Sequence, residues 1–554
     1  MRYRPGRLNR LRFILDRSLR MSNVTERAWQ AYGEAEAFAT DAPLDYLGLD
    51  RRLSFGDVHR TVGRLAWVLR RNGLGRYGRV VIYKENSLDY FLFALAVIRA
   101  GGIAVPVHGG LGAADFAQYA AHCGCEMVFT DPATFNKLDA QAFPGVRTWL
   151  FTRTPVTACA NSVVIEQVLN MDTPQLDASD INTHDDALIV HTSGTTGFPK
   201  GVLHSSYSLL RAVRTQMAFS PLPMGERALT AAHQNHHITF TGMLLCLMAG
   251  AWTHAAIDLT PRALLTTMQE QRVTMFFAFP DIYLNLHREG MARYDLSRMR
   301  RWISGGDAMH EIHIRACVEQ GGSRIAGVPI KGSLFFQFLG TSEVGSAALT
   351  RISTRHTRTF GRCVGRPTPI GPRVKVADEH GRRLPPGQPG RLMVRGRTLF
   401  KGYWNAHDRA HGTIVDGWWW TGDIAVRDRL GRYHQLDRDV DMVATVNGPV
   451  YGLPIEEELL KCEDVGEAVI IGVANAGGSD SPVAVVHSRS GGAVDTRALL
   501  AHINARLPPR QRLAAVVDAG GPAGIPRGLT GKVLKRRLRE RHANRLRASE
   551  ADAA

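Results

Sequence analysis

Long apolar runs and paired cysteines are both missing from this sequence. Its longest apolar run, Phe91–Ile98, is far shorter than the roughly 20 residues that cross a bilayer. The seven cysteines are scattered, odd in number and without a CxxC pair, which argues against a disulfide framework and a zinc site. We therefore expect no membrane-spanning helix and a reducing, cytoplasmic location.

Aromatic residues are not interleaved with the basic clusters, although the formal net charge is +17. Such interleaving is typical of proteins that stack bases on aromatic rings. Seven arginines and one aspartate lie within residues 1–20, and a second basic cluster runs from Lys532 to Arg547. The excess charge is therefore concentrated near the two ends, and we expect no nucleic-acid partner.

Residues 1–20 form a basic N-terminal arm whose status has several interpretations. Its leucines and isoleucine recur at near-helical spacing, the pattern of an amphipathic helix lying on a membrane surface. A transit peptide is an alternative. We favour an idle tail or a start assigned too early, because Met21 opens a more ordinary beginning. Peripheral membrane contact through the arm stays open as an alternative to a purely cytoplasmic protein.

The rest of the chain has the composition of a folded protein, with 44% hydrophobic and 21% charged residues. From about residue 55, short apolar runs such as "RVVIYKEN" and "VTMFFAF" alternate with amphipathic stretches, which indicates an α/β architecture. Near residue 370 the pattern changes to turns and short β segments. We predict a large N-terminal domain over 21–436 with parallel sheets and a small β region, a hinge at 437–441, and a small mobile α+β domain over 442–554.

The stretch "HTSGTTGFPKGV", residues 191–202, follows an apolar run and is rich in glycine, serine and threonine. Consecutive backbone N–H groups and hydroxyls in such a turn form a concave anion site, to which Lys200 adds a charge. Glycine allows the backbone to approach a phosphate closely. The pattern does not match GxxxxGK[ST]. The loop is therefore predicted to bind phosphate in a fold other than the P-loop one.

This stretch closely resembles the phosphate-binding signature of the adenylate-forming superfamily, which includes acyl-CoA synthetases. Further segments resemble the other motifs of that superfamily, in the expected order and over roughly residues 50 to 545. They are "WISGGDAM" (302–309), "LGTSE" (339–343), "GYW" (402–404), "WWWTGD" (418–423), "DRDVDMV" (437–443) and "IPRGLTGKVLKRRLR" (525–539). A single motif of this kind would be weak evidence for the superfamily, whereas the ordered set is specific to it.

The resemblance implies ATP, Mg2+ and coenzyme A as cofactors and assigns roles to single residues. Lys532 would bridge the incoming carboxylate and the α-phosphate of ATP, Glu343 would be the magnesium ligand, and Thr192 would assist in catalysis. The implied nucleotide-binding residues are Thr192, Ser193, Gly194, Thr195, Thr196, Gly197, Lys200, Gly305, Gly306, Asp307, Leu339, Gly340, Thr341, Ser342, Asp423, Arg438 and Lys532. After adenylation, the small domain would turn about the hinge and withdraw Lys532.

Some positions depart from the superfamily pattern. Val440 stands where Asp or Lys is common at the hinge, Asn447 where glycine is usual, and Pro454 where an acidic residue is usual. These changes weaken the prediction of the second, thioester-forming step relative to the prediction of adenylation. Leu339 replaces a common aromatic residue, as in relatives that use aromatic acids. Asp307 follows the glycine pair, where it either bonds locally or lines the acid pocket.

The segment 233–252, "HQNHHITFTGMLLCLMAGAW", occupies the region that lines the acyl pocket in the superfamily and is mostly apolar. The predicted substrate-pocket residues are His236, His237, Gly242 and Gly305, with His237 as a candidate gate. We therefore expect a lipophilic carboxylic acid, aliphatic or aromatic, as in fatty acid metabolism, that is activated as an acyl adenylate and passed to coenzyme A. The alternatives are transfer to a carrier-protein phosphopantetheine or an amine, and a protein that binds nucleotide or acyl ligand without catalysis.

Overall fold

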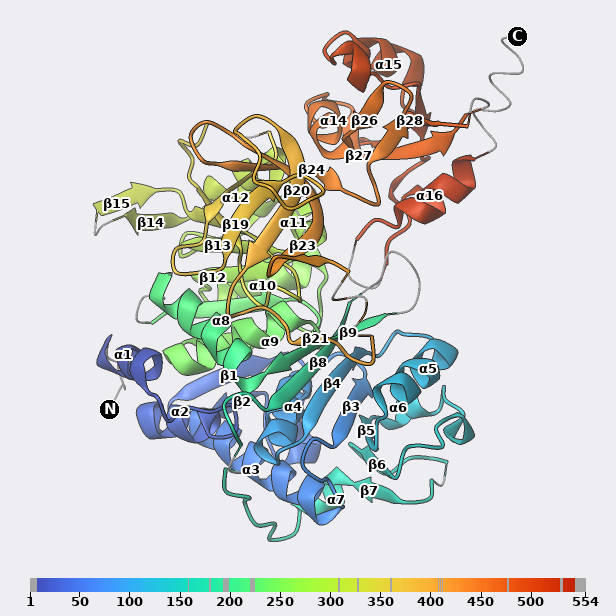
Figure 1. The fold of residues 1–554 in the computed structure, drawn as a ribbon. Coiled ribbons are helices and arrows are strands. Elements are labelled where there is room, and N and C mark those ends of the chain that lie inside the picture. Colours follow the sequence, from blue (N-terminus) through green and yellow to red (C-terminus); the bar gives the residue numbers. More distant parts are fainter. Residues whose placement is uncertain are drawn as a thin grey trace.

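The chain folds into a large N-terminal domain and a smaller C-terminal domain with its own sheets (Figure 1). This computed structural model describes residues 7–157, 159–178, 181–192, 199–219, 225–306, 309–325, 328–358, 361–406, 408, 410, 412–475, 478–528 and 532–543. The predicted α/β class is confirmed. Across these ranges, every helix is too short or too polar to span a bilayer.

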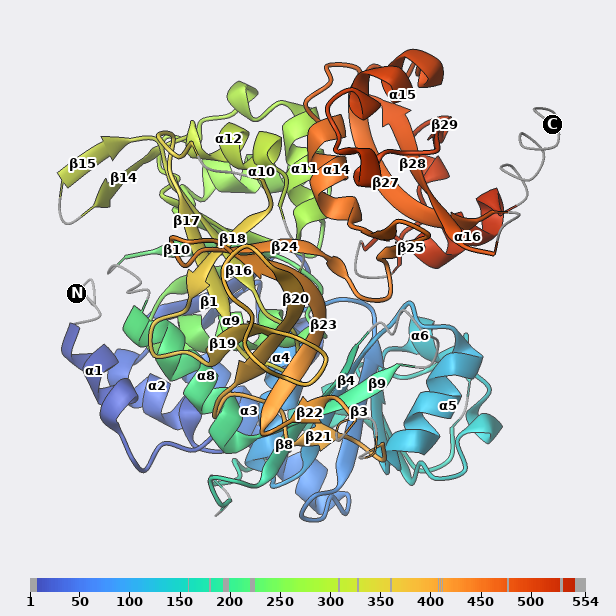
Figure 2. The ribbon, with the colours of Figure 1, turned by 45° about the horizontal axis from the view of Figure 1, so that its top comes forward.

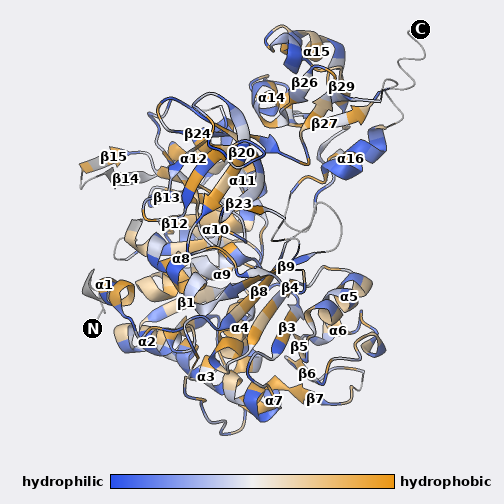
Figure 3. Ribbon diagram, viewed as in Figure 1, coloured by the Kyte–Doolittle hydropathy of each residue, from blue (hydrophilic) through white to orange (hydrophobic). Residues whose placement is uncertain are grey.

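One sheet of the large domain carries the first part of the chain and is mostly parallel. Its strands, in spatial order, are β21 (Gly402–Tyr403), β9 (Lys200–Ser205), β8 (Asp186–Thr192), β4 (Ile103–His108), β3 (Arg79–Lys84), β5 (Met127–Thr130), β6 (Thr148–Phe151) and β7 (Ser162–Val164). The central strands are buried on both faces, which explains why they read as continuous apolar runs (Figure 3).

A second, longer sheet joins a parallel half to an antiparallel half. The parallel half contains β1 (Glu36–Thr40), β11 (Trp252–Ala255), β10 (Arg227–Ala231), β12 (Met275–Ala278), β13 (Arg301–Gly305) and β16 (Leu334–Leu339), with β2 (Arg52–Ser54) antiparallel at its edge. The antiparallel half contains β17 (Leu349–Ser353), β18 (Cys363–Pro367), β24 (Tyr433–Arg438), β23 (Trp418–Arg427), β22 (Ile414–Val415), β20 (Pro389–Arg395) and β19 (Arg373–Ala377). The latter is the predicted small β region. A separate hairpin pairs β14 (Gly322–Ile325) with β15 (Val328–Lys331).

Helices cover both faces of these sheets. A shared core packs one group between the two sheets: α2 (Val24–Tyr32), α3 (Phe55–Arg71), α4 (Asp89–Arg99), α8 (Ser206–Phe219) and α9 (His237–Ala249). The outer faces carry α5 (Ala113–Cys123) and α6 (Pro132–Phe135) on one side, and α10 (Pro261–Glu270), α11 (Pro280–Glu289) and α12 (Glu311–Val318) on the other. The short α7 (Ile165–Leu169) follows β7.

The small domain follows β24 and stands beside the carboxyl ends of the parallel strands (Figure 2). It contains a hairpin of β25 (Val443–Thr445) and β26 (Gly448–Val450), and a sheet of β27 (Val465–Ala474), β28 (Asp480–Ser488) and β29 (Ala515–Asp518). Its helices are α14 (Gly452–Leu459), α15 (Thr496–Asn504) and α16 (Lys535–His542). The strands β27 and β28 coincide with the apolar runs "GEAVIIGVAN" (466–475) and "SPVAVVHS" (481–488) of the sequence.

The N-terminal arm is packed against the large domain. Helix α1 (Arg7–Leu15) lies on α8 and α9. Phe13 and Leu19 are buried in the shared core, and Arg214 donates a hydrogen bond of 3.0 Å to the Phe13 carbonyl. The idle-tail interpretation is therefore wrong for residues 10–20. Leu11 and Leu15 remain exposed, so the apolar stripe of the arm is divided between core and surface.

Candidate functional site

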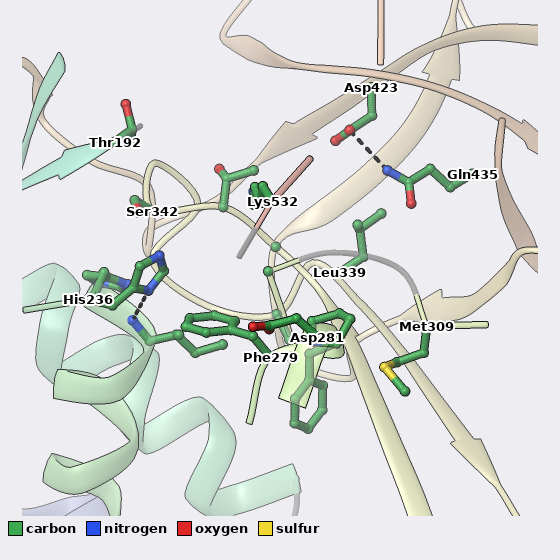
Figure 4. Close-up of a pocket in the computed structure, with 18 of the residues that line it drawn as sticks. Thr192, His236, Phe279, Asp281, Met309, Leu339, Ser342, Asp423, Gln435 and Lys532 are labelled. Carbon is green, nitrogen blue, oxygen red and sulfur yellow. Dashed lines mark hydrogen bonds between the residues drawn. The ribbon is translucent and has the colours of Figure 1, made fainter. Parts of the chain in front are cut away.

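A cavity of about 610 Å³ lies where the carboxyl ends of the parallel strands, the antiparallel half-sheet and the small domain meet. Its polar part is lined by residues from both domains, and an apolar part extends beneath α9. Most of the residues that the sequence singled out line this one space. Figure 4 shows several of them pointing toward one another.

Asp423, on β23, is held in place inside the polar part of the cavity. Its carboxylate accepts hydrogen bonds from Thr421 Oγ1 at 2.9 Å and from Gln435 Nε2 at 3.2 Å, the latter shown in Figure 4. Arg438, its register partner on β24, places Nε 4.0 Å from Asp423 Oδ1. Burial raises the pKa of Asp423, and the charges of Arg438 and Lys532 act in the opposite direction. The remaining acceptor capacity of this carboxylate faces the cavity.

Glu343 follows β16 and is also buried, with 8% of its surface exposed. Tyr403, on β21, donates a hydrogen bond of 2.9 Å to Glu343 Oε1, and Lys200 Nζ lies 5.0 Å from the centre of the Tyr403 ring. A strand from the first sheet thereby orients a carboxylate of the second sheet. Glu343 and Lys200 lie in one charged corner of the cavity.

The loop of Gly340, Thr341 and Ser342 connects β16 to Glu343 and lines the cavity. His204, on β9, holds this loop: its Nε2 donates to the Ser342 carbonyl at 2.7 Å. Burial lowers the pKa of His204 to about 4, so the ring is neutral at pH 7. The neutral tautomer that donates this bond carries its proton on Nε2. Leu339 is buried at the end of β16 and lines the cavity.

Thr192 and Lys200 face each other as register partners at the ends of β8 and β9. Both line the cavity. The loop between them, with Ser193, Gly194, Thr195, Thr196 and Gly197, lies outside the described residues, and so does Asp307. The described strands therefore place the two ends of the predicted phosphate-binding loop at the polar part of the cavity.

The glycine pair at the end of β13 is required by close packing. Gly306 has φ of +86°, and a Cβ there would lie 2.9 Å from the Phe279 ring. A Cβ on Gly305 would lie 2.7 Å from Ile238 Cδ1, on α9. Gly306 lines the cavity, whereas Gly305 packs against Ile238 behind it. At the mouth of the apolar part, Gly305 therefore allows the close approach of α9, and Gly306 allows the close approach of Phe279.

His236 and His237 both line the cavity but have different surroundings. His236 accepts a hydrogen bond of 3.4 Å from the Ile238 N–H, and its ring lies 4.9 Å from that of Phe279. His237 stacks on His204 with ring centroids 4.6 Å apart. Burial lowers the pKa of His236 to about 3, with Lys532 adding to the effect, and it lowers the pKa of His237 well below its usual range. The two rings are therefore neutral at pH 7.

Lys532 enters the cavity from the small domain, near Ser342 and Asp423 (Figure 4). It directly precedes Val533, which pairs with Arg527, and its carbonyl accepts a hydrogen bond of 2.8 Å from the Gly528 N–H. The hinge position Val440 is half exposed, and its carbonyl accepts a hydrogen bond of 3.2 Å from Arg539 on α16. Asn447 sits at the tip of the β25–β26 hairpin and Pro454 in the first turn of α14. None of these three departures disrupts the local secondary structure.

Several residues that the sequence did not single out shape the site. Gln435 and Tyr403 orient the two carboxylates, and Phe279, Asp281 and Met309 line the cavity (Figure 4). Burial raises the pKa of Asp281. Tyr403 lies within the quoted "GYW", but nothing in the sequence indicates that its hydroxyl reaches Glu343. Gln435 sits on β24 at a position with no motif.

The described residues contain no group of three or more His, Cys, Asp or Glu side chains able to enclose a metal ion. The donor set instead fits an ion held partly by a substrate. Glu343 commits one oxygen to Tyr403 and faces the polar part of the cavity. Mg2+ is commonly bound by one or two carboxylates together with phosphate oxygens and water, so a single carboxylate fits this cation.

Several known proteins resemble this chain in sequence or in fold. A 3-aminoavenalumate diazotase from a Streptomyces species is 29% identical over 89% of this chain and 89% of the relative. A feruloyl-CoA synthase from an Amycolatopsis species is 27% identical over 88% and 94%. The crystal structure of ATP-bound MatB from Rhodopseudomonas palustris shares the fold, with a TM-score of 0.81 at 24% identity over 95% of this chain and 100% of that one. The family model described as AMP-binding enzyme matches residues 25–404, and the chain therefore belongs to the AMP-binding enzyme family.

Proposed function

We propose that the protein activates a lipophilic carboxylic acid with ATP as an acyl adenylate and passes the acyl group to the thiol of coenzyme A. One observation carries this proposal: Lys532 of the small domain and Asp423 of the large domain line one cavity that continues into an apolar part. A cation, a ribose-binding carboxylate and an apolar acid pocket are the elements that this chemistry needs. The feruloyl-CoA synthase relative supports the same reaction class.

In the first step, a carboxylate oxygen of the acid would attack the α-phosphorus of ATP, while the bond to the pyrophosphate oxygen breaks. Negative charge builds up on the α-phosphate and on the leaving group, and preorganised cations stabilise such charge. Lys532 would bridge the acid and the α-phosphate, and Lys200 with the Gly340–Ser342 loop would hold the outer phosphates. Asp423 would accept hydrogen bonds from the ribose hydroxyls, and Arg438 would contact the nucleotide.

Glu343 would hold Mg2+, which neutralises phosphate charge when bound. The fit rests on the orientation of Glu343 by Tyr403. His204 would keep the Ser342 backbone in place without adding charge, because it is neutral. The neutral His236 and Phe279 would exclude water from the acid at the mouth of the apolar part.

The transfer step would require Lys532 to leave the cavity with the small domain, about a hinge at 437–441. Rigid-body closure of this kind needs a pliable linker and alternative interfaces. The half-exposed Val440 lies in this segment. After the rotation, a thiol sulfur would attack the acyl carbonyl carbon and AMP would leave.

A second candidate keeps the activation step but delivers the activated group to a carrier-protein thiol or an amine. The diazotase relative is named for a reaction other than thioester formation, which favours a fate of the activated group that does not involve coenzyme A. The departures at Val440, Asn447 and Pro454 point in the same direction, since they lie in the segment that would form the second conformation.

The decisive assay is acid-dependent pyrophosphate release over aryl, fatty and amino acids, with and without coenzyme A. Lys532→Ala should lower the rate by about 10²–10³-fold, because one preorganised charge in the transition state is lost. Arg536→Ala is the matched control, since that cation is exposed on α16. Stimulation by coenzyme A supports the thiol ligase, and release indifferent to coenzyme A supports the second candidate. A Lys532→Ala variant as active as wild type would contradict both.

A further inference from the structure

The apolar part of the cavity runs along one face of the parallel half-sheet, beneath α9. Side chains alternate along a strand, and those on this face form rows across the strands. At the carboxyl ends, Gly305 on β13 pairs with Phe338 on β16. Two residues earlier along the strands, Thr230, Phe277 and Ile303 form the next row. Two residues earlier again come Ala228, Thr253 and Met275.

The strand and the helix give the same length for this channel. The row of Ala228 lies in register with Arg301, four residues before Gly305, which corresponds to about 13 Å at the rise of a β-strand. On the opposite wall, Ile238 lies at the mouth and Cys246 lines the far end, a separation of about 12 Å at the rise of an α-helix. An extended chain advances by roughly 1.2 Å per bond, so the channel accepts about ten bonds.

The channel is kept open by small residues. Gly242 lies on α9 midway along the channel, and a Cβ there would meet no atom within 4 Å. Ala228, Thr253 and Cys246 line the far end, where larger side chains would close the space. The walls nearer the mouth are aromatic: Phe277, Phe279 and Phe338. Aromatic walls at the mouth and unfilled space deeper in the channel suit a ligand that is planar and long.

Thr230 is one of the described cavity-lining residues with a buried side-chain atom that has no hydrogen-bond partner. Thr230 is only 6% exposed and lines the channel, and its Oγ1 makes no hydrogen bond. A buried hydroxyl without a partner is costly, and most native ones are satisfied. Its neighbour Leu229 points into the core on the other face of the sheet. Thr230 lies two residues below the Gly305 row, or about 7 Å along the strand direction.

We infer that the acid is an elongated aryl-alkenoic acid whose ring carries a hydroxyl or amino group, and that Thr230 binds this group. The inference rests on the proposed function for the position of the carboxylate, at the mouth near Gly306 and Lys532. A ring joined through an unsaturated linker would lie flat between the aromatic walls. Its polar substituent would then reach the row of Thr230, where it supplies the missing hydrogen-bond partner.

The first test compares cinnamic acid with 3- and 4-hydroxycinnamic acid by calorimetric titration in the presence of α,β-methylene ATP. Wild type should bind a hydroxylated acid about tenfold more tightly than cinnamic acid, the gain expected from one buried hydrogen bond. Thr230→Val should remove this preference, and Thr230→Ser should keep it. Thr215→Val is the matched control, because Thr215 also buries an unpartnered hydroxyl but lies on α8 outside the cavity. Equal binding of the acids by wild type, or an unchanged preference in Thr230→Val, would overturn the inference.

The second test concerns length. Gly242→Leu fills the middle of the channel, so it should abolish binding of 5-phenylpenta-2,4-dienoic acid while benzoic acid still binds. Retained binding of the long acid would overturn the inference. Pyrophosphate release is measured separately: selective binding without release would contradict the proposed function alone, and release without selectivity would contradict the inference alone.

Discussion

At the scale of single residues, burial keeps the histidines around the cavity neutral. Burial lowers the pKa of His191 and of His204 to about 4, and lowers that of His236 to about 3. Neutral rings beside the polar part avoid repulsion with Lys532 and Lys200. A neutral His204 also keeps one ring nitrogen available as acceptor near Ser208 while the other donates to Ser342.

These depressed values predict acid sensitivity. Below the unfolded pKa of about 6.5, the unfolded chain binds protons that the folded chain does not, so the free energy of unfolding falls from about pH 6.5 to about pH 4. Each such histidine contributes at most about 3 kcal/mol to this loss. His204→Gln should flatten the pH dependence in urea unfolding, whereas His502→Gln, an exposed position, should not. A profile that is flat in wild type over this interval would contradict the prediction.

Part of the site could be predicted at this scale. The motifs indicated Asp423, Ser342 and Lys532, and the structure places these three around one cavity, although their roles remain predictions. Thr230 could not be found, because a threonine in an apolar strand looks like an ordinary sheet residue. Its significance depends on which face of β10 carries the channel, and the sequence of one strand does not contain that information.

At the scale of elements, the buried parallel strands were the easiest to predict. β3, β4 and β12 read as short apolar runs because both of their faces are covered. Helix α1 was interpreted wrongly in part, because its charge and its leucines fit a surface helix equally well. Phe13 shows that the helix is packed against the core, because it stacks on Tyr32 of α2 and is only 5% exposed.

Phe13 therefore offers a test of the arm as a structural element. Phe13→Ala should lower the free energy of unfolding by about 3 kcal/mol, the usual cost of removing a buried aromatic ring. Leu15→Ala, on the same helix but exposed, should change it by no more than about 0.5 kcal/mol. Denaturant unfolding of the two variants provides the comparison, and equal effects would show that α1 does not contribute to the core.

At the scale of the whole molecule, the small domain is seated on the large one by buried charges. Glu457, on α14, accepts a hydrogen bond of 2.9 Å from His310 Nδ1, and Arg362 Nη1 lies 3.9 Å from the same carboxylate oxygen. Burial alone would raise the pKa of Glu457, but the His310 hydrogen bond and the Arg362 charge bring it to about 2. No periodicity in the sequence links positions so far apart, so this contact was not predictable.

This contact should stabilise the placement that brings Lys532 into the cavity. Glu457→Gln leaves the buried Arg362 without its counter-charge, and a charged hydrogen bond contributes about 1.5–3 kcal/mol. We expect at least a tenfold slower release of pyrophosphate, measured as an initial rate with saturating acid and ATP. Glu458→Gln, which affects only a surface pair with Lys461, is the control. An unchanged rate in Glu457→Gln would mean that the contact does not contribute to the activating arrangement.

The pairing of β21 with β9 also has a consequence for biosynthesis. Tyr403 lies beside Val202, but it leaves the ribosome roughly 200 residues later, a delay of about 10–40 s at ordinary elongation rates. Until then, the edge of β9 next to the predicted phosphate-binding loop stays uncovered, and Glu343 lacks the hydroxyl that orients it. A nascent chain that has made β9 but not yet β21 therefore lacks both the cover of that strand edge and the tyrosine hydroxyl that orients Glu343.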